Sequence, residues 1–119
     1  MPTPKGMITA AQAQNLNDNW TNLRSRANDS AAGKPDNRSS WYSFDDLQDF
    51  LNIIKGDNPD VNGVRFYLGT ETSLIDKKGL TTIFMVPTVE KDGITRDIPG
   101  ARGMDRGAEG DPPESGYPQ

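Results

Sequence analysis

A stretch of nine residues, 61–69, constrains the fold of this chain more than any other. It reads Val-Asn-Gly-Val-Arg-Phe-Tyr-Leu-Gly, so that apolar residues alternate with Arg65 and Tyr67. A period of two is typical of a β-strand with one buried face, and the glycines at 63 and 69 mark its ends. We therefore predict a strand that lies centrally in a sheet. The residues predicted to face the core are Val64, Phe66 and Leu68.

Two further strands are expected downstream. Residues 80–88 read Leu-Thr-Thr-Ile-Phe-Met-Val-Pro-Thr, with apolar residues on both faces. Proline cannot donate to a strand ladder, so Pro87 predicts a bulge or a sheet edge. The Asp92-Gly93 pair favours a tight turn and a weaker hairpin between the segments on either side of it.

Two helices are expected before these strands. Thr9 and Gln12 have the spacing of a capping box, and apolar residues follow it at helical intervals as far as Ala27. Residues 28–39 are polar and contain Gly33 and Pro35, which predicts a loop. Ser43 begins the second helix with Asp46 at its third position. The apolar residues assigned to its buried face are Phe44, Leu47, Leu51 and Ile54, with Phe50 beside them.

These elements predict an α+β fold, in which two N-terminal helices pack on one face of a small antiparallel sheet. We expect residues 1–98 to form one domain. Ten of the 32 residues from Thr88 onward are Gly or Pro, and this segment carries four Lys or Arg against seven Asp or Glu. Such a composition buries little apolar surface, so residues 99–119 are predicted to be a flexible acidic tail.

The composition excludes several kinds of chemistry. The chain has no Cys and no His, which removes disulfides, thiolate nucleophiles, zinc sites of the Cys/His kind and histidine-based catalysis. No phosphate-binding glycine loop is present, and we expect no cofactor and no metal. Residues 1–87 carry nine Lys or Arg against ten Asp or Glu, a balance that argues against nucleic acid as a partner. No signal-peptide pattern and no membrane-length apolar run is present, so we expect a cytoplasmic protein.

Three segments together resemble a group of small bacterial proteins without an assigned activity. The segments are Ser40-Trp-Tyr-Ser-Phe-Asp-Asp-Leu, Gly63-Val-Arg-Phe-Tyr-Leu-Gly and Leu80-Thr-Thr-Ile-Phe-Met-Val-Pro-Thr. The resemblance covers residues 40 to 88. It implies a bacterial cytosolic origin and assigns no functional residue.

Two functional hypotheses follow from the side chains that remain. In the first, the protein is a non-catalytic interaction module that binds a protein partner, or a second copy of itself. The binding surface is then the acidic tail or the sheet face predicted to carry Arg65, Tyr67, Ile83 and Met85, because Tyr, Arg and Met are enriched at interfaces. The alternative is a small hydrolase or ligand-binding enzyme built from Asp36, Arg38, Arg65 and Tyr67. In that case arginine would hold an anionic group and the aspartate would act as a base.

Overall fold

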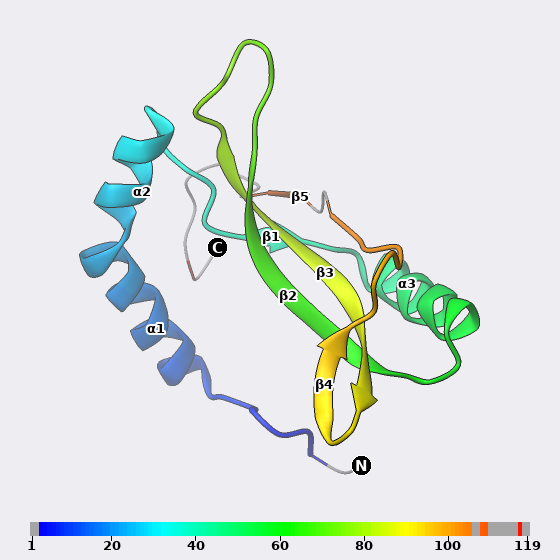
Figure 1. The fold of residues 1–119 in the computed structure, drawn as a ribbon. Helices are drawn as coiled ribbons and strands as arrows, with labels where there is room; N and C mark the ends of the chain where they lie inside the picture. The colour runs from blue at the N-terminus through cyan, green and yellow to red at the C-terminus, as the bar shows by residue number, and fades with distance from the viewer. Residues whose placement is uncertain (1–2, 106–107, 110–116, 118–119) are drawn as a thin grey trace.

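The computed structural model describes residues 3–105, 108–109 and 117. Its helices are α1 (Ala10–Leu23), α2 (Ser25–Ala32) and α3 (Phe44–Asp57). Its strands are β1 (Ser40–Trp41), β2 (Val61–Glu71), β3 (Leu80–Lys91), β4 (Ile94–Asp97) and β5 (Ala108–Glu109) (Figure 1). Strands β2, β3 and β4 form an antiparallel sheet in that order, and β1 pairs with β5 separately. The predicted α+β class with an antiparallel sheet is confirmed.

The first predicted helix is observed as two. Thr9 and Gln12 form the expected capping box: the Thr9 side chain accepts from the Gln12 amide at 3.1 Å, and the Gln12 side chain accepts from the Thr9 amide at 2.8 Å. The helix is interrupted at Arg24 and resumes as α2, which extends to Ala32. Residues 28–32 are therefore helical, although a loop was predicted there. The chain leaves α2 at Gly33, whose φ of +74° suits glycine.

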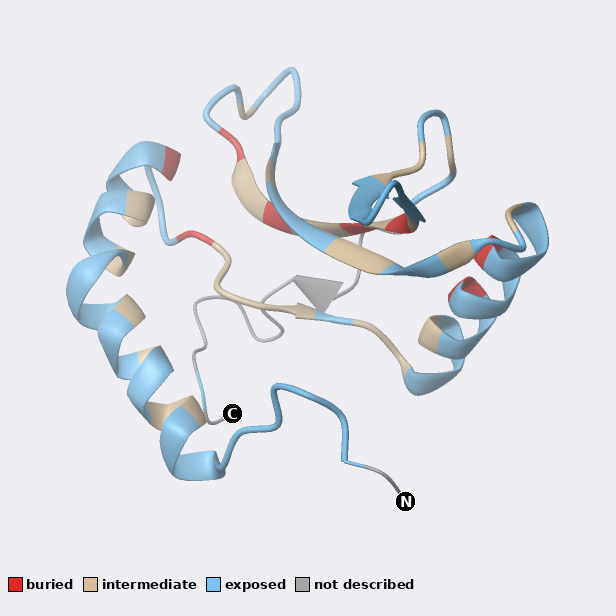
Figure 2. Cartoon of the chain, turned by 60° about the horizontal axis from the view of Figure 1, so that its bottom comes forward, coloured by how far each residue is buried: buried red, intermediate tan, exposed pale blue. Residues whose placement is uncertain are grey.

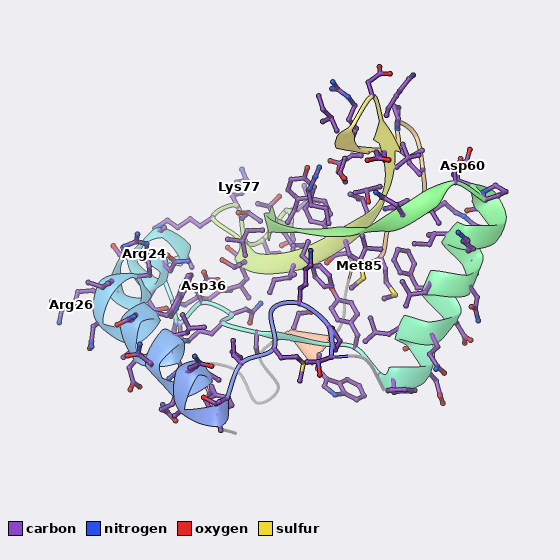
Figure 3. All side chains as sticks on the ribbon, turned by 90° about the horizontal axis from the view of Figure 1, so that it is seen from below. Arg24, Arg26, Asp36, Asp60, Lys77 and Met85 are labelled. Atoms are coloured by element: carbon purple, nitrogen blue, oxygen red, sulfur yellow. The ribbon has the colours of Figure 1, made fainter. Side chains whose placement is uncertain are left out.

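Helix α3 begins as predicted, because the Ser43 hydroxyl accepts from the Asp46 amide at 3.0 Å. Its buried face is rotated from the predicted one. Phe50 and Ile54 are buried and Leu47 is half-buried, whereas Phe44 is 74% exposed. Leu51 is also exposed. Positions 47, 50 and 54 form a helical stripe of their own, and this stripe meets Met85 on the sheet (Figure 3).

The central strand of the sheet is β3. The prediction that the segment 61–69 lies centrally is wrong, because β4 returns along the opposite side of β3 and leaves β2 at the edge. The return passes through Asp92 and Gly93, both with positive φ, so the predicted tight turn is confirmed. β2 and β3 pair from Val61–Val89 to Glu71–Leu80, with a bulge between Val61 and Gly63.

Pro87 is fully buried within the central strand. Its carbonyl accepts from the Ile98 amide at 3.1 Å, so its backbone groups point to the side of β3 where β4 has just ended. The missing N–H of proline therefore costs no ladder hydrogen bond.

The core is small and lies between α3 and β3. Phe50, Ile54 and Met85 form its buried cluster, and half-buried residues such as Val64 and Met104 pack against it. Figure 2 shows buried positions along β3 and on the inner side of α3, whereas β2 and α1 contain none. The radius of gyration is 16.4 Å, above the roughly 13.5 Å expected for a compact domain of this length. The elements are therefore packed less compactly than in a typical domain of this length.

The described part of the predicted tail, residues 99–105, runs along the sheet. Met104 exchanges two backbone hydrogen bonds with Met85, each 2.9 Å long. Arg102 forms a two-point ion pair with Asp57 at the end of α3, at 2.9 and 3.0 Å. Most of residues 106–119 lie outside the described part of the chain. Among the helices that are described, none has the length and apolar character needed to span a bilayer.

Candidate interaction site

Arg65 and Tyr67 lie together on the sheet face turned away from Met85. Arg65 forms an ion pair with Asp97 of β4 at 2.8 Å, and the Tyr67 hydroxyl donates to the other carboxylate oxygen of Asp97. The Tyr67 ring stacks on Phe84 with 5.5 Å between ring centroids. The side-chain hydrogen bond with Tyr67, followed by the charge of Asp97, raises the pKa of Arg65 above its ordinary value, so its guanidinium stays charged. These two predicted interface residues thus hold β4 to β2.

The role of Asp97 as the partner of Arg65 and Tyr67 was not predicted from the sequence. The Asp92-Gly93 turn was the available signal, because it fixes which residue of β4 lies beside which residue of β3. With Thr88 opposite Asp97, the Asp97 carboxylate comes within reach of β2 across the sheet.

Ile83 and Met85 do not share this face, so their predicted placement beside Arg65 and Tyr67 is wrong. Leu68 pairs with Ile83 and Phe66 pairs with Met85, and directly opposed residues project to the same side of a sheet. Met85 is 1% exposed and belongs to the core. The predicted grouping failed because alternation within one strand does not reveal its register with the next strand.

Asp36 is a buried carboxylate that connects α2, the following loop and β3 (Figure 3). One of its oxygens accepts from the backbone amides of Thr81 and Asn37, at 2.7 and 2.9 Å. The other accepts from the Asn28 amide group at 3.2 Å and from the Thr81 hydroxyl at 2.5 Å. Burial alone would raise the pKa of Asp36, but these hydrogen bonds outweigh burial and lower it.

The four residues of the alternative enzyme site have separate partners. Arg38 donates to the carbonyl and side-chain oxygens of Asn17 in α1, at 3.2 and 3.0 Å. Asp36 is fully engaged with Asn28, Asn37 and Thr81, and the pair on β2 is engaged with Asp97. Within residues 3–105, no direct hydrogen bond or ion pair links any of these three places to another. In the same range no cluster of acidic residues is arranged to hold a metal ion.

The outer edge of β3 is closed along most of its length. β4 pairs with its end, and the segment 36–42 together with residues 98–104 occupies the rest. The groups satisfied in this way are the Thr81 amide by Asp36, the Thr81 carbonyl by Asn37, the Ile83 carbonyl by the Tyr42 hydroxyl, both Met85 groups by Met104, and the Pro87 carbonyl by Ile98.

Among the described residues, none pairs with the outer edge of β2. Opposed residues in an antiparallel pair alternate between those that bond to each other and those whose N–H and C=O point away. Because Met85 bonds to Met104, its partner Phe66 must point its backbone groups away from β3. The same holds for every second residue of the strand. We call the outward N–H and C=O groups of Val64, Phe66, Leu68 and Thr70 the β2 edge, and within the described ranges nothing pairs with it.

Side chains beside this edge are also uncovered. Phe66 is 57% exposed and Leu68 is 69% exposed, although both were predicted to be core residues. Helix α3 packs on the sheet near Val64 and Met85, and no helix of the described chain packs on Phe66 or Leu68. The β2 edge and these two side chains form the candidate site.

Comparison with known proteins adds no relative: no family model, no curated protein and no solved structure matches this chain.

Proposed function

We propose that this protein is a non-catalytic protein-interaction module that binds an extended segment of its partner along the β2 edge. The observation that carries the proposal is the contrast between the two edges of one sheet. The outer edge of β3 is bonded by β4, by other backbone segments and by three side chains, whereas the outer edge of β2 offers outward backbone groups at four alternate residues.

An exposed edge strand is a template for another strand, and soluble proteins usually protect it. The common protections are proline, lysine, a bulge or a covering segment. From Val64 to Thr70, β2 has no proline and no lysine, and its bulge lies before this stretch. Such an edge is the surface used by domains that bind peptides by strand addition, where backbone hydrogen bonds supply affinity and alternate side chains supply specificity.

The flanking side chains favour a segment with alternating character. Phe66 and Leu68 present an apolar surface on one face of the sheet. Arg65 and Tyr67 are partly exposed on the other face, where they are held in place by Asp97. A bound strand with apolar residues on one side and an acidic or polar residue on the other would complement both faces.

The proposal is tested by displaying a random peptide library to the wild-type protein and measuring the selected peptides against two variants. Leu68→Pro removes one outward N–H without touching the bonds to β3, and Leu68→Ala removes the side chain but keeps that N–H. We expect the selected peptides to bind wild type and Leu68→Ala, and to lose at least about tenfold in affinity for Leu68→Pro.

Amide exchange measured by NMR locates the binding. On addition of a selected peptide, the amides of Phe66, Leu68 and Thr70 should become protected, while those of Arg65 and Tyr67, already bonded to β3, should change little. Thermal melts must show that both variants remain folded. Peptides that bind Leu68→Pro as well as they bind Leu68→Ala would overturn the proposal, as would protection that falls elsewhere.

A further inference from the structure

We infer that the tip of the β2–β3 hairpin docks in a hollow beside α3 on a second copy of this chain. The hairpin tip is the segment 73–79. The α3 hollow is a cavity of about 290 Å³ lined by Asp46, Asp49, Phe50, Ile53 and the segment 102–104. Neither surface includes the β2 edge, so this inference is independent of the proposed function.

Two tight turns that share Asp76 form the hairpin tip. In the first turn, the Ser73 amide donates to the Asp76 carbonyl and the Asp76 amide donates to the Ser73 hydroxyl, each at 2.9 Å. In the second turn, the Gly79 amide donates to one carboxylate oxygen of Asp76 at 2.9 Å. Lys34, just after α2, forms an ion pair with the other carboxylate oxygen at 2.8 Å. These contacts hold the tip in shape without a partner.

The first turn carries the two most exposed large apolar side chains of the described chain. Leu74 is 95% exposed and Ile75 is 99% exposed. The middle of a tight turn usually holds Gly, Pro, Asn, Asp or Ser, so two aliphatic residues there depart from local preference. Such departures are expected at functional sites. Adjacent apolar side chains that protrude from a braced loop therefore indicate a contact surface.

The second turn gives the hairpin tip a positive charge. Lys77 forms no ion pair with any residue in the described part of the chain, and Figure 3 shows it at the outer surface of the loop. Lys34 is engaged with Asp76, and the Lys78 side chain lies against Gly33 at the end of α2. Lys77 is therefore the cation that the tip offers to a partner.

The α3 hollow has an apolar wall. Phe50 and Met104 belong to this wall and also pack in the core, so their positions are fixed. Ile53 lies one turn further along α3 and is 47% exposed, which leaves its side chain open to a partner. The hollow thus offers apolar contact to Leu74 and Ile75 of another copy.

Two carboxylates stand beside this wall on α3. Asp46 and Asp49 are exposed, and within residues 3–105 neither of them forms an ion pair. Arg102 also lines the hollow, but its guanidinium is bound at two points by Asp57. The free charge of the hollow is therefore negative, and Lys77 of a docked tip would complement it.

A chain cannot fill its own hollow with its own tip. Val64 packs beside α3, and β2 continues for seven residues beyond it to Glu71, a length of roughly 23 Å. The tip thus lies at the far end of the hairpin from α3 (Figure 1). Because the tip and the hollow are different surfaces, copies either exchange tips around a twofold axis or add to one another in a row.

Sedimentation measures the apolar part of this contact. Wild type should associate as its concentration rises, and Leu74→Ser combined with Ile75→Ser should raise the dissociation constant at least about tenfold. The matched control is Leu16→Ser combined with Leu23→Ser, which removes two exposed leucines from α1 and should leave the dissociation constant unchanged. Thermal melts should show that all these variants are folded. Equal effects of the two double changes would overturn the docking.

Charge exchange tests the pairing itself. Lys77→Glu and Asp49→Lys should each weaken association about tenfold, whereas a chain carrying both changes should recover most of the wild-type affinity. Asp45→Lys makes the same charge change at an exposed residue of α3 outside the hollow, and it should have little effect.

Three outcomes would overturn the docking. The first is a wild type that stays monomeric at high concentration. The second is a chain with both charge changes that associates no more tightly than the chains with one. The third is association that is lost in Leu68→Pro, which would place the contact between copies at the β2 edge instead.

Discussion

At the scale of single residues, Asp36 has the most demanding position in the molecule. Its carboxylate is 5% exposed, and its partners come from α2, from the loop after it and from β3. A buried carboxylate is tolerated only when its oxygens are satisfied, and here both are. The Asp36 amide in turn donates to the Asp29 side chain at 2.9 Å, so this residue also fixes the end of α2.

We expect Asp36→Asn to lower the free energy of unfolding by roughly 2–3 kcal/mol at neutral pH. Asparagine has one acceptor oxygen, which can take over the two backbone amides of Thr81 and Asn37, but its amide group would then face the Asn28 amide group and the Thr81 hydroxyl, which are both donors to Asp36. Urea unfolding followed by circular dichroism measures the loss. Asp60→Asn, at an exposed aspartate before β2, is the control and should change stability by less than about 0.5 kcal/mol. Equal effects of the two changes would contradict the role of Asp36.

The same residue should appear in the acid unfolding of the protein. Because the folded state lowers the pKa of Asp36, its stabilising contribution is complete above the ordinary value of 3.8 and is lost as the pH falls through the lowered pKa. Melting temperature should therefore fall below about pH 4, and less steeply in Asp36→Asn. Part of the dependence of melting temperature on pH should persist in the variant. The hydrogen bond from Lys34 lowers the pKa of Asp76, so Asp76 also stabilises the folded state less as the pH falls. An unchanged slope in the variant would remove Asp36 from the explanation.

At the scale of elements, α3 is the helix that holds the sheet. Its capping residue follows from local chemistry and was predicted correctly from Ser43 and Asp46. Its buried face was not predicted correctly. Phe44 and Phe50 each fit an apolar stripe on the helix, and only the position of Met85 in the folded sheet determines that the stripe with Phe50 is buried. The order of the strands was unpredictable for the same reason: alternation reveals that β2 has two faces, but not which of its edges has a neighbour. The open β2 edge was therefore absent from the sequence-based expectations.

The two phenylalanines of α3 test its orientation. Phe50→Ala should cost about 3–5 kcal/mol, because it leaves a cavity against Ile54 and Met85. Phe44→Ala, at a side chain that is 74% exposed, should cost less than about 1 kcal/mol. If Phe50→Ala fails to fold, the stability of Ile54→Val can be compared with that of Phe44→Ala instead. Ile54→Val has an expected cost of about 0.5–1.5 kcal/mol. Denaturant melts in which Phe44→Ala is the more damaging change would show that the buried face is assigned wrongly.

At the scale of the whole molecule, α1 and α2 form an arm beside the sheet (Figure 1). α1 has no buried residue, and Asn17 links it to the loop after α2 by accepting two hydrogen bonds from Arg38. α2 is fastened more firmly, through Ala32 and the contacts of Asn28 and Asp29 with Asp36. Local stability should therefore decrease from the sheet toward the N-terminus.

Native-state hydrogen exchange should reveal this gradient. Amides of α1 are expected to exchange through local opening, with a free energy well below that of the central residues of β3. Low concentrations of urea should leave the free energy of exchange of the α1 amides nearly unchanged. They should reduce the free energy of exchange of the β3 amides, because only global unfolding exposes β3. Equal free energies in α1 and β3 would mean that the arm and the sheet unfold as one unit.

The loop between β2 and β3 has a consequence for how this protein can be divided. It closes on itself: the Ser73 amide donates to the Asp76 carbonyl and the Gly79 amide donates to the Asp76 side chain, each at 2.9 Å. At its tip, Leu74 and Ile75 are 95% and 99% exposed. The ladder between the two strands, not the peptide chain across this tip, keeps them together. Two polypeptides made separately and meeting at Ile75 should therefore reassemble into the native sheet, which co-purification of a tagged half with an untagged one would reveal. The chain would then serve as a split reporter, in which recovery of the fold signals that two fused proteins have met.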